Sequence, residues 1–239
     1  MNITNRFARS ILHIYGFGWL LGGIVYFYAG IIAPIFYLPS THYTADVAVQ
    51  SMQHLKPYWF YYGLSFFIFT IADTAMMLLG LVFRRIFGVT FNTSMAAFCL
   101  FAGGFIGVFV DLSLLTCWLL IGNFNLTPEL LQGFWSVFLV VQYLGIILTA
   151  WGFLIGGVGV YLIYKTSQQS TSVSNAWRKW TLAIFWLCLL NVLAIIFALL
   201  TNNGLPTALL FLFFTVVVAP VWTLLLSRNS VLISNVNLG

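Results

Sequence analysis

The sequence contains very few charged residues. Lysine and arginine together number nine, and aspartate and glutamate number four, so 5% of the 239 residues are charged, against about 25% in soluble domains. So few charges cannot cover a water-exposed surface, whereas a lipid-facing surface does not need them. The shortage of charge therefore excludes an ordinary soluble domain. The net charge of +5 is not gathered into a basic tract, so nucleic acid is not an expected partner.

Cysteine and histidine are also scarce, with three residues of each. Cys99, Cys117 and Cys188 lie inside apolar runs without a C-x-x-C pair, which predicts neither a disulfide framework nor a zinc ribbon. The sequence has no H-E-x-x-H motif, no phosphate-binding loop and no nucleophile–base pair. We therefore expect a protein without catalytic residues, metal or cofactor.

Long apolar runs are what the sequence does contain. Hydrophobic residues make up 62% of the chain and the mean hydropathy is +1.04. A helix needs about 20 residues to cross the ~30 Å hydrocarbon core of a membrane. Six stretches are long enough: 11–37, 58–83, 93–121, 131–164, 180–201 and 205–227. The prediction is an all-α bundle of six transmembrane helices in a single integral membrane domain.

The basic residues predict the orientation of the bundle. With six spans, eight of the nine basic residues fall on the side of the two termini, and only Lys56 falls on the other side. An excess of lysine and arginine marks the cytoplasmic side of a membrane protein. We therefore expect both termini in the cytoplasm.

The segments between the spans have recognisable features. Residues 38–57 form the longest outer loop and are expected to include an amphipathic helix, which either lies on the membrane surface or forms a lid over an outward-facing cavity. Thr127 has the character of a helix N-cap, followed by a proline and a glutamate. Residues 166–175 read as a polar cytoplasmic linker. Trp177 and Trp180 flank two basic residues and are expected to be interfacial anchors. Most tyrosines and tryptophans of this chain are expected in the aromatic belt or facing lipid.

Three pairs of glycines recur at a spacing of four residues: Gly18 and Gly22, Gly103 and Gly107, Gly152 and Gly156. Small residues at this spacing let transmembrane helices approach closely. The faces could pack within this bundle or dock another membrane protein, and the sequence does not separate these alternatives.

Four strongly polar residues are expected at a common depth in the membrane. Counted from the outer ends of their spans, Asp73, Asp111, Gln142 and Asn191 fall within about 8 Å of one another along the membrane normal, at ~1.5 Å per residue. A carboxylate facing lipid costs about 2.5 kcal/mol or more, so both aspartates are expected to face the bundle interior. No lysine or arginine is available at this depth.

This polar layer has two interpretations. The four residues could hydrogen-bond to one another and hold the helices together, with both acids protonated. Alternatively, Asp73 and Asp111 could form a proton- or cation-binding site, because acids inside a membrane often mark such pathways.

The order of these features resembles bacterial six-span membrane proteins of domain-of-unknown-function family 4386. The resemblance lies in a basic N-terminus, the outer segment THYTADVAVQSMQHL, the aspartate of FTIADTAMMLLGLVF in the second span, and a short basic and polar linker after the fourth. It covers roughly residues 6–200. It implies a bacterial cytoplasmic membrane and draws attention to Asp73, and it implies no activity.

Two functions follow from the sequence. The first is a non-catalytic accessory or assembly subunit of a membrane complex, with the lipid bilayer, other membrane subunits or further copies of itself as partners. The second is a small proton- or cation-coupled transporter or channel that uses Asp73 and Asp111. The glycine faces favour the first function, and the polar layer favours the second.

Overall fold

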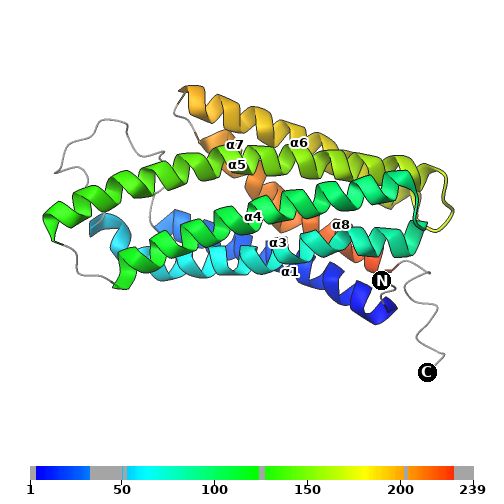
Figure 1. The fold of residues 1–239 in the computed structure, drawn as a ribbon, viewed down its shortest axis with the longest axis horizontal. Coiled ribbons are helices and arrows are strands. Elements are labelled where there is room, and N and C mark those ends of the chain that lie inside the picture. The colour runs from blue at the N-terminus through cyan, green and yellow to red at the C-terminus, as the bar shows by residue number, and fades with distance from the viewer. Residues whose placement is uncertain (1–3, 33–49, 51–52, 124–126, 202–203, 229–239) are drawn as a thin grey trace.

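The computed structural model describes residues 4–32, 50, 53–123, 127–201 and 204–228. Over these residues the chain is helical, with short connections (Figure 1). In chain order, the elements are α1 (Asn5–Ile32), η1 (Lys56–Tyr58), α3 (Trp59–Phe87), α4 (Phe91–Asn123), α5 (Pro128–Gln168), α6 (Asn175–Thr201), α7 (Leu205–Phe213), η2 (Phe214–Val218) and α8 (Ala219–Ser227).

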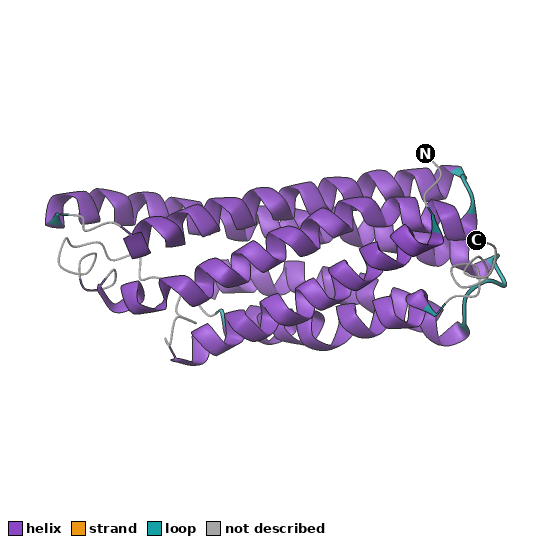
Figure 2. Cartoon of the chain, turned by 90° about the horizontal axis from the view of Figure 1, so that it is seen from below, coloured by secondary structure: helices purple, strands orange, loops and turns teal. Residues whose placement is uncertain are grey.

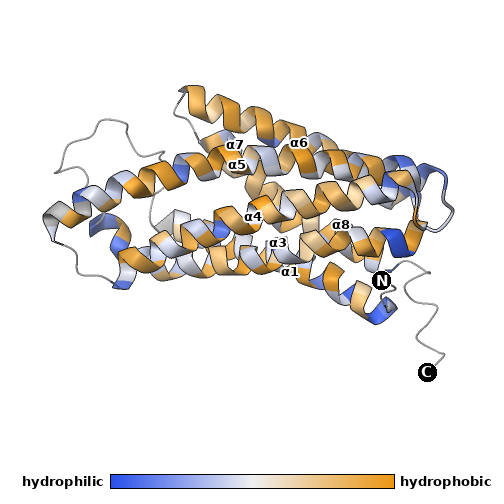
Figure 3. Cartoon of the chain, viewed as in Figure 1, coloured by the Kyte–Doolittle hydropathy of each residue, from blue (hydrophilic) through white to orange (hydrophobic). Residues whose placement is uncertain are grey.

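Within the described residues, six helical segments are long and apolar enough to cross a membrane, which confirms the predicted number of spans. They are Asn5–Gly30, Gln53–Phe87, Phe91–Asn123, Gln132–Gln168, Asn175–Thr201 and Leu205–Ser227. Hydrophobic residues cover the middle of the helices, and the most hydrophilic residues gather towards their two ends (Figure 3). This distribution is typical of an integral multi-pass membrane protein.

The six spans form a closed ring. Each span packs against the next one along the chain, and α8 returns to pack against α1. The helices run roughly along one common direction, as Figure 2 shows. Spans on opposite sides of such a ring are held apart, so the space at its centre has to be filled by side chains or left as a cavity.

The basic helix ends gather at one end of the bundle. Helix α1 begins there, α3 ends there with Arg84 and Arg85 in its last turn, and α5 ends there with Lys165 in its last turn (Figure 1). Helix α6 begins and α8 ends at the same end. We call this the basic end. The alternation of six antiparallel spans therefore brings together the residues that the charge pattern assigned to one side.

Several predicted boundaries differ from the observed ones. Helix α1 begins at Asn5 rather than near residue 11, so that Arg6 and Arg9 are part of the helix. Helix α5 continues through Gln168 and α6 begins at Asn175, so the predicted linker 166–175 is reduced to residues 169–174. Most of the predicted amphipathic helix in 38–57 lies outside the described residues.

The predicted start of the fourth span is confirmed. Thr127 is the N-cap of α5, its side chain accepts a hydrogen bond from the Leu130 amide at 3.5 Å, and Pro128 lies in the first helical positions. A threonine oxygen and a proline both suit a helix start, because the first amide groups lack partners within the helix.

The last span contains a π-helical segment next to a proline. Residues Phe214–Val218 form the π-helix η2, and Pro220 follows it at the start of α8. Proline has no amide hydrogen, and its ring clashes with the carbonyl four residues earlier. The wider turn of η2 lies at the place where that disturbance is expected, and π-helical turns often accompany functional sites.

The expectation that Trp177 is an interfacial anchor is wrong. Five of the nine tryptophans are buried in the bundle, among them Trp177, which is 1% exposed and had been assigned to an interfacial anchor. Flanking basic residues are typical of an interfacial tryptophan, but they do not show which face of the helix the ring occupies. The contact with α8 determines that face here.

Candidate functional site

A cavity of about 310 Å³ lies at the centre of the ring. All six spans contribute to its lining. It extends from Gly204, just before α7, towards Trp222 on the basic side. Its volume lies at the lower end of the range for small-molecule sites, which is about 300–1,000 Å³.

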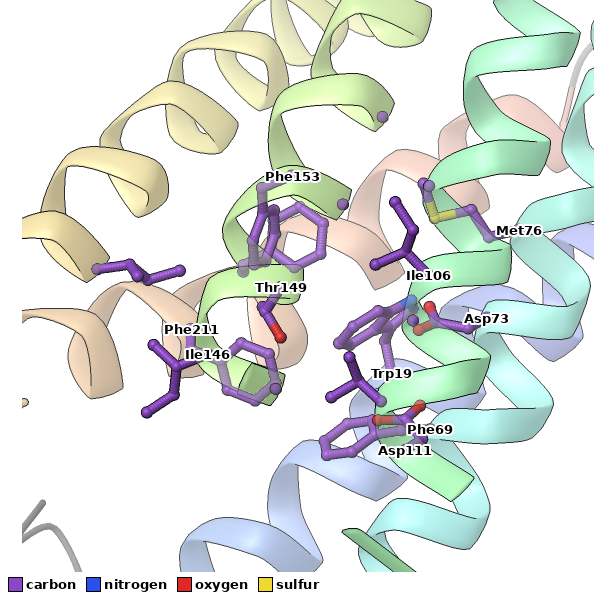
Figure 4. Close-up of a pocket in the computed structure, with 18 of the residues that line it drawn as sticks. Trp19, Phe69, Asp73, Met76, Ile106, Asp111, Ile146, Thr149, Phe153 and Phe211 are labelled. Carbon is purple, nitrogen blue, oxygen red and sulfur yellow. The ribbon is translucent and has the colours of Figure 1, made fainter. Parts of the chain in front are cut away.

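Asp73 and Asp111 both line this cavity. Asp73 lies in the middle of α3 and Asp111 in α4, and their side chains are 5% and 7% exposed. The two carboxyl groups are close enough to interact electrostatically. Figure 4 shows both carboxyl groups on the same side of the cavity, near Trp19 and Phe69. The structure therefore brings together the two acids that the sequence placed at similar depth.

A close approach of α3 and α4 positions the Asp73 carboxyl. A methyl group at Gly107 would collide with the Asp73 Oδ2 atom, and a methyl group at Gly104 would stand 2.7 Å from the Asp73 carbonyl oxygen. Only a residue without a side chain fits at either position. The two glycines thus form a notch on α4 that receives Asp73.

The acids have no hydrogen-bond partner among the described residues. Asp111 Oδ2 is buried without a partner, and the same is true of three other polar atoms around the cavity: Trp19 Nε1, Trp118 Nε1 and Thr207 Oγ1. Buried polar atoms are paired in most proteins, and leaving one unpaired costs about 1–3 kcal/mol. These four atoms therefore have hydrogen-bonding capacity that no described residue uses.

The four residues of the predicted polar layer differ in whether they line the cavity. Gln142 lines the cavity together with the two acids, but Asn191 does not. Asn191 is fully buried, and its side-chain amide donates a hydrogen bond of 2.9 Å to the Leu187 carbonyl of its own helix. Among the described residues, no hydrogen bond joins any two of these four side chains. The interhelical hydrogen-bond network that the sequence allowed is therefore not formed.

Four aromatic rings form one wall of the cavity: Trp19, Phe69, Phe211 and Phe214. Trp19 lies 5.2 Å from Phe69, 5.8 Å from Phe211 and 5.6 Å from Phe214 between ring centroids. We call these four residues the aromatic wall. Because its members come from α1, α3, α7 and η2, the wall exists only once the ring of helices has closed.

Three further aromatic residues close the bundle towards the basic end. Trp222 stacks on Trp177 at 5.9 Å and contacts Phe83 at 5.7 Å between ring centroids. Trp222 Nε1 donates a hydrogen bond of 2.9 Å to Thr181 Oγ1. All three rings are at most 2% exposed, and we call them the aromatic floor. The cavity therefore ends on a packed layer before the basic end.

The paired glycines pack within the chain. A methyl group at Gly18 would stand 2.9 Å from the Ala72 Cβ atom, and one at Gly22 would stand 2.6 Å from the Phe69 ring. A methyl group at Gly103 would stand 3.2 Å from the Gly152 carbonyl oxygen and 3.3 Å from the Gly156 amide nitrogen. These close contacts join α1 to α3 and α4 to α5. Gly103, Gly107, Gly152 and Gly156 also line the cavity.

The aromatic wall and floor were not predicted, because the residues that form them come from separate spans. The spacing of each ring along its own helix gave no sign of a common site. No protein-family model, no curated protein and no solved structure matches this chain.

Proposed function

We propose that this chain is an integral membrane protein that couples the movement of a proton or another cation to a small solute, with Asp73 and Asp111 as the coupling groups. The observation that carries this proposal is the pair of buried carboxyl groups on the wall of a central cavity, without a hydrogen-bond partner among the described residues. Intramembrane acids with this placement mark proton and ion pathways.

The proposal includes an orientation. The excess of basic residues at one end supports a cytoplasmic location for that end and for both termini. The cavity would then extend towards the outer side, because Gly204 lies at the opposite ends of α6 and α7. In this orientation the aromatic floor would separate the cavity from the cytoplasmic side, which is the arrangement expected of a transporter in an outward-facing state. A bacterial inner membrane suits this orientation, and it also suits the resemblance to family 4386, which stays a prediction.

An accessory subunit is less well supported. That function depended on glycine faces being free to dock a second protein. Gly18, Gly22, Gly103 and Gly107 pack against α3 and α5 of the same chain instead. Other apolar surface remains on the outside of the bundle, and the bilayer alone suffices to cover it.

The first test measures whether the two acids titrate. The carboxylic-acid band in the infrared spectrum of the protein, reconstituted in lipid, would be followed between about pH 5 and pH 9, a range in which buried carboxyl groups often ionise. We expect a reversible loss of this band as the pH rises. The signal should fall in Asp73→Asn and in Asp111→Asn and should disappear in the double variant.

A matched control is Glu129→Gln, which removes one carboxyl group at the beginning of α5. This variant should leave the pH dependence of the carboxylic-acid infrared band unchanged. If the unmodified protein and the double variant give the same spectra over this range, the two acids do not exchange protons and the proposed function fails.

A further inference from the structure

We propose that the cavity binds a lipophilic organic cation, a molecule with one positive charge among aromatic or aliphatic groups. The inference rests on the proposed function, because the same two acids that exchange protons would hold the cation. It adds the chemical class of the solute, which follows from the charge and the surface of the cavity.

The charge of the lining selects a cation. Asp73 and Asp111 line the cavity, and no lysine, arginine or histidine does so among the described residues. An anion would meet two carboxyl groups and no basic partner. A buried charge is tolerated only where an opposite charge compensates it. A cation receives that compensation from the ionised acids, whereas an anion does not.

The rest of the lining selects an organic molecule rather than a small metal ion. Aliphatic and aromatic side chains make up most of the surface, including the aromatic wall. A small hard cation such as Ca²⁺ takes six to eight oxygen ligands, and the two acids together supply four carboxyl oxygens. An aromatic wall instead attracts organic cations, because the faces of aromatic rings carry partial negative charge.

The acids allow the cation and protons to compete for the site. In the absence of the cation, the low dielectric of the cavity favours protonated carboxyl groups. When the cation binds, a carboxylic acid releases its proton to water, and the resulting carboxylate pairs with the cation. The charge inside the cavity stays balanced, and one proton leaves for each cation that enters. Coupling in a transporter requires this kind of exchange.

The first experiment compares two probes of the same shape and opposite charge on the purified protein in detergent. Tetraphenylphosphonium is the cation and tetraphenylborate the anion, and binding is followed by isothermal titration calorimetry. We expect saturable binding of the phosphonium only. Its affinity should rise on the order of tenfold for each pH unit over the range in which one proton is displaced. In weak buffer, the solution should acidify when the phosphonium is added.

Variants then locate the bound cation. Asp73→Asn and Asp111→Asn should each weaken phosphonium binding at least about tenfold, and the double variant should also lose its pH dependence, because an amide cannot supply the negative charge. Trp19→Leu should weaken binding about 2- to 30-fold through the loss of a ring of the aromatic wall. Trp151→Leu is the matched control: this ring is 54% exposed on the outside of α5, and its loss should leave the affinity unchanged.

The outcomes separate this inference from the function on which it rests. If the carboxyl band titrates but the phosphonium does not bind, or if phosphonium and borate bind equally well, the organic cation is wrong and the proton-coupled function stands. If phosphonium binds equally to the unmodified protein and to the double aspartate variant, the inference also fails. If the carboxyl band does not titrate, both proposals fail together. The comparison of the two probes uses the unmodified protein and does not depend on the folding of any variant.

Discussion

Gly107 determines where the Asp73 carboxyl group lies. It sits on α4 where that helix faces α3, and the Asp73 side chain occupies the space that a methyl group at residue 107 would fill. Glycine is the residue that allows another chain segment to approach this closely. A single missing side chain thus places a carboxyl group inside an apolar bundle.

Replacement of Gly107 by alanine tests this arrangement. The added methyl group should force the Asp73 side chain or the two helices to move. Overpacking of this kind costs about 1–3 kcal/mol, so we expect a lower thermal unfolding midpoint in detergent and an altered titration of the carboxyl band. Both properties can be measured on the same purified sample.

Gly133→Ala is the matched control, because a methyl group there meets nothing within 4 Å. Alanine is favoured over glycine in a helix by about 0.5–1 kcal/mol, so the control should be neutral or slightly stabilised. An unchanged midpoint and an unchanged titration in Gly107→Ala would show that Asp73 does not depend on the notch.

At the scale of the elements, the pairing of α6 with α8 supports the aromatic floor. The hydrogen bond from Trp222 Nε1 to Thr181 Oγ1 joins the two helices, and the ring of Trp177 stacks on that of Trp222. Inside an apolar bundle, the indole N–H has no water to bond with, so the threonine hydroxyl is needed as its acceptor. The π-helix η2 lies just before α8 and contributes Phe214 to the aromatic wall.

Thr181→Val tests the pairing of these two helices. Valine keeps the shape of threonine but leaves the Trp222 N–H buried without an acceptor, which costs about 1–3 kcal/mol. We expect a lower unfolding midpoint and a shift in tryptophan fluorescence, because Trp222 and Trp177 would change surroundings. Thr116→Val provides the comparison.

Thr116 lies on an exposed part of α4, where its hydroxyl donates only to the Leu112 carbonyl of the same helix. Its replacement removes no bond between helices, so the stability of that variant should be nearly unchanged. Equal effects of the two substitutions would argue against a special role for the contact between α6 and α8.

At the scale of the whole molecule, the ring of spans brings the basic residues of the helix termini together at one end of the bundle. Lys56 is the exception. The two polar ends of the bundle therefore differ in charge, and the chain can be oriented in a membrane by that difference. The cavity is asymmetric along the same axis, because the aromatic floor closes it on the basic side.

Cysteine labelling tests the predicted orientation. Val89 and Thr171 lie in exposed connections at the basic end, and Asn123 is exposed at the opposite end. With single cysteines at these positions, a membrane-impermeant maleimide should label Asn123→Cys in intact bacterial cells. Val89→Cys and Thr171→Cys should react only after lysis.

The native cysteines lie buried in the bundle and should contribute little background; the unmodified protein is the control that measures it. Labelling of Val89→Cys in intact cells, without labelling of Asn123→Cys, would reverse the orientation and place the cavity on the cytoplasmic side.

The sequence by itself determined the number of spans, their approximate bounds and the presence of two acids at depth. These features depend on local properties: a hydrophobic run of sufficient length has to be helical in lipid, because its backbone groups have no other partners there. The burial of Asp73 and Asp111 follows in the same way from the cost of a carboxylate that faces lipid. The N-cap of α5 at Thr127 could also be predicted from the sequence, because helix caps depend on neighbouring residues.

Only the tertiary structure decided how the polar and aromatic residues are used. Asn191 has the sequence position expected of a cavity residue, but its side chain hydrogen-bonds within its own helix. Trp177 is flanked by basic residues, as interfacial tryptophans are, but it lies in the core. Depth along a helix can be counted from the sequence, whereas the direction of a side chain depends on which helices become neighbours. The closure of α8 onto α1 sets those neighbours, and with them the cavity, its aromatic wall and its floor.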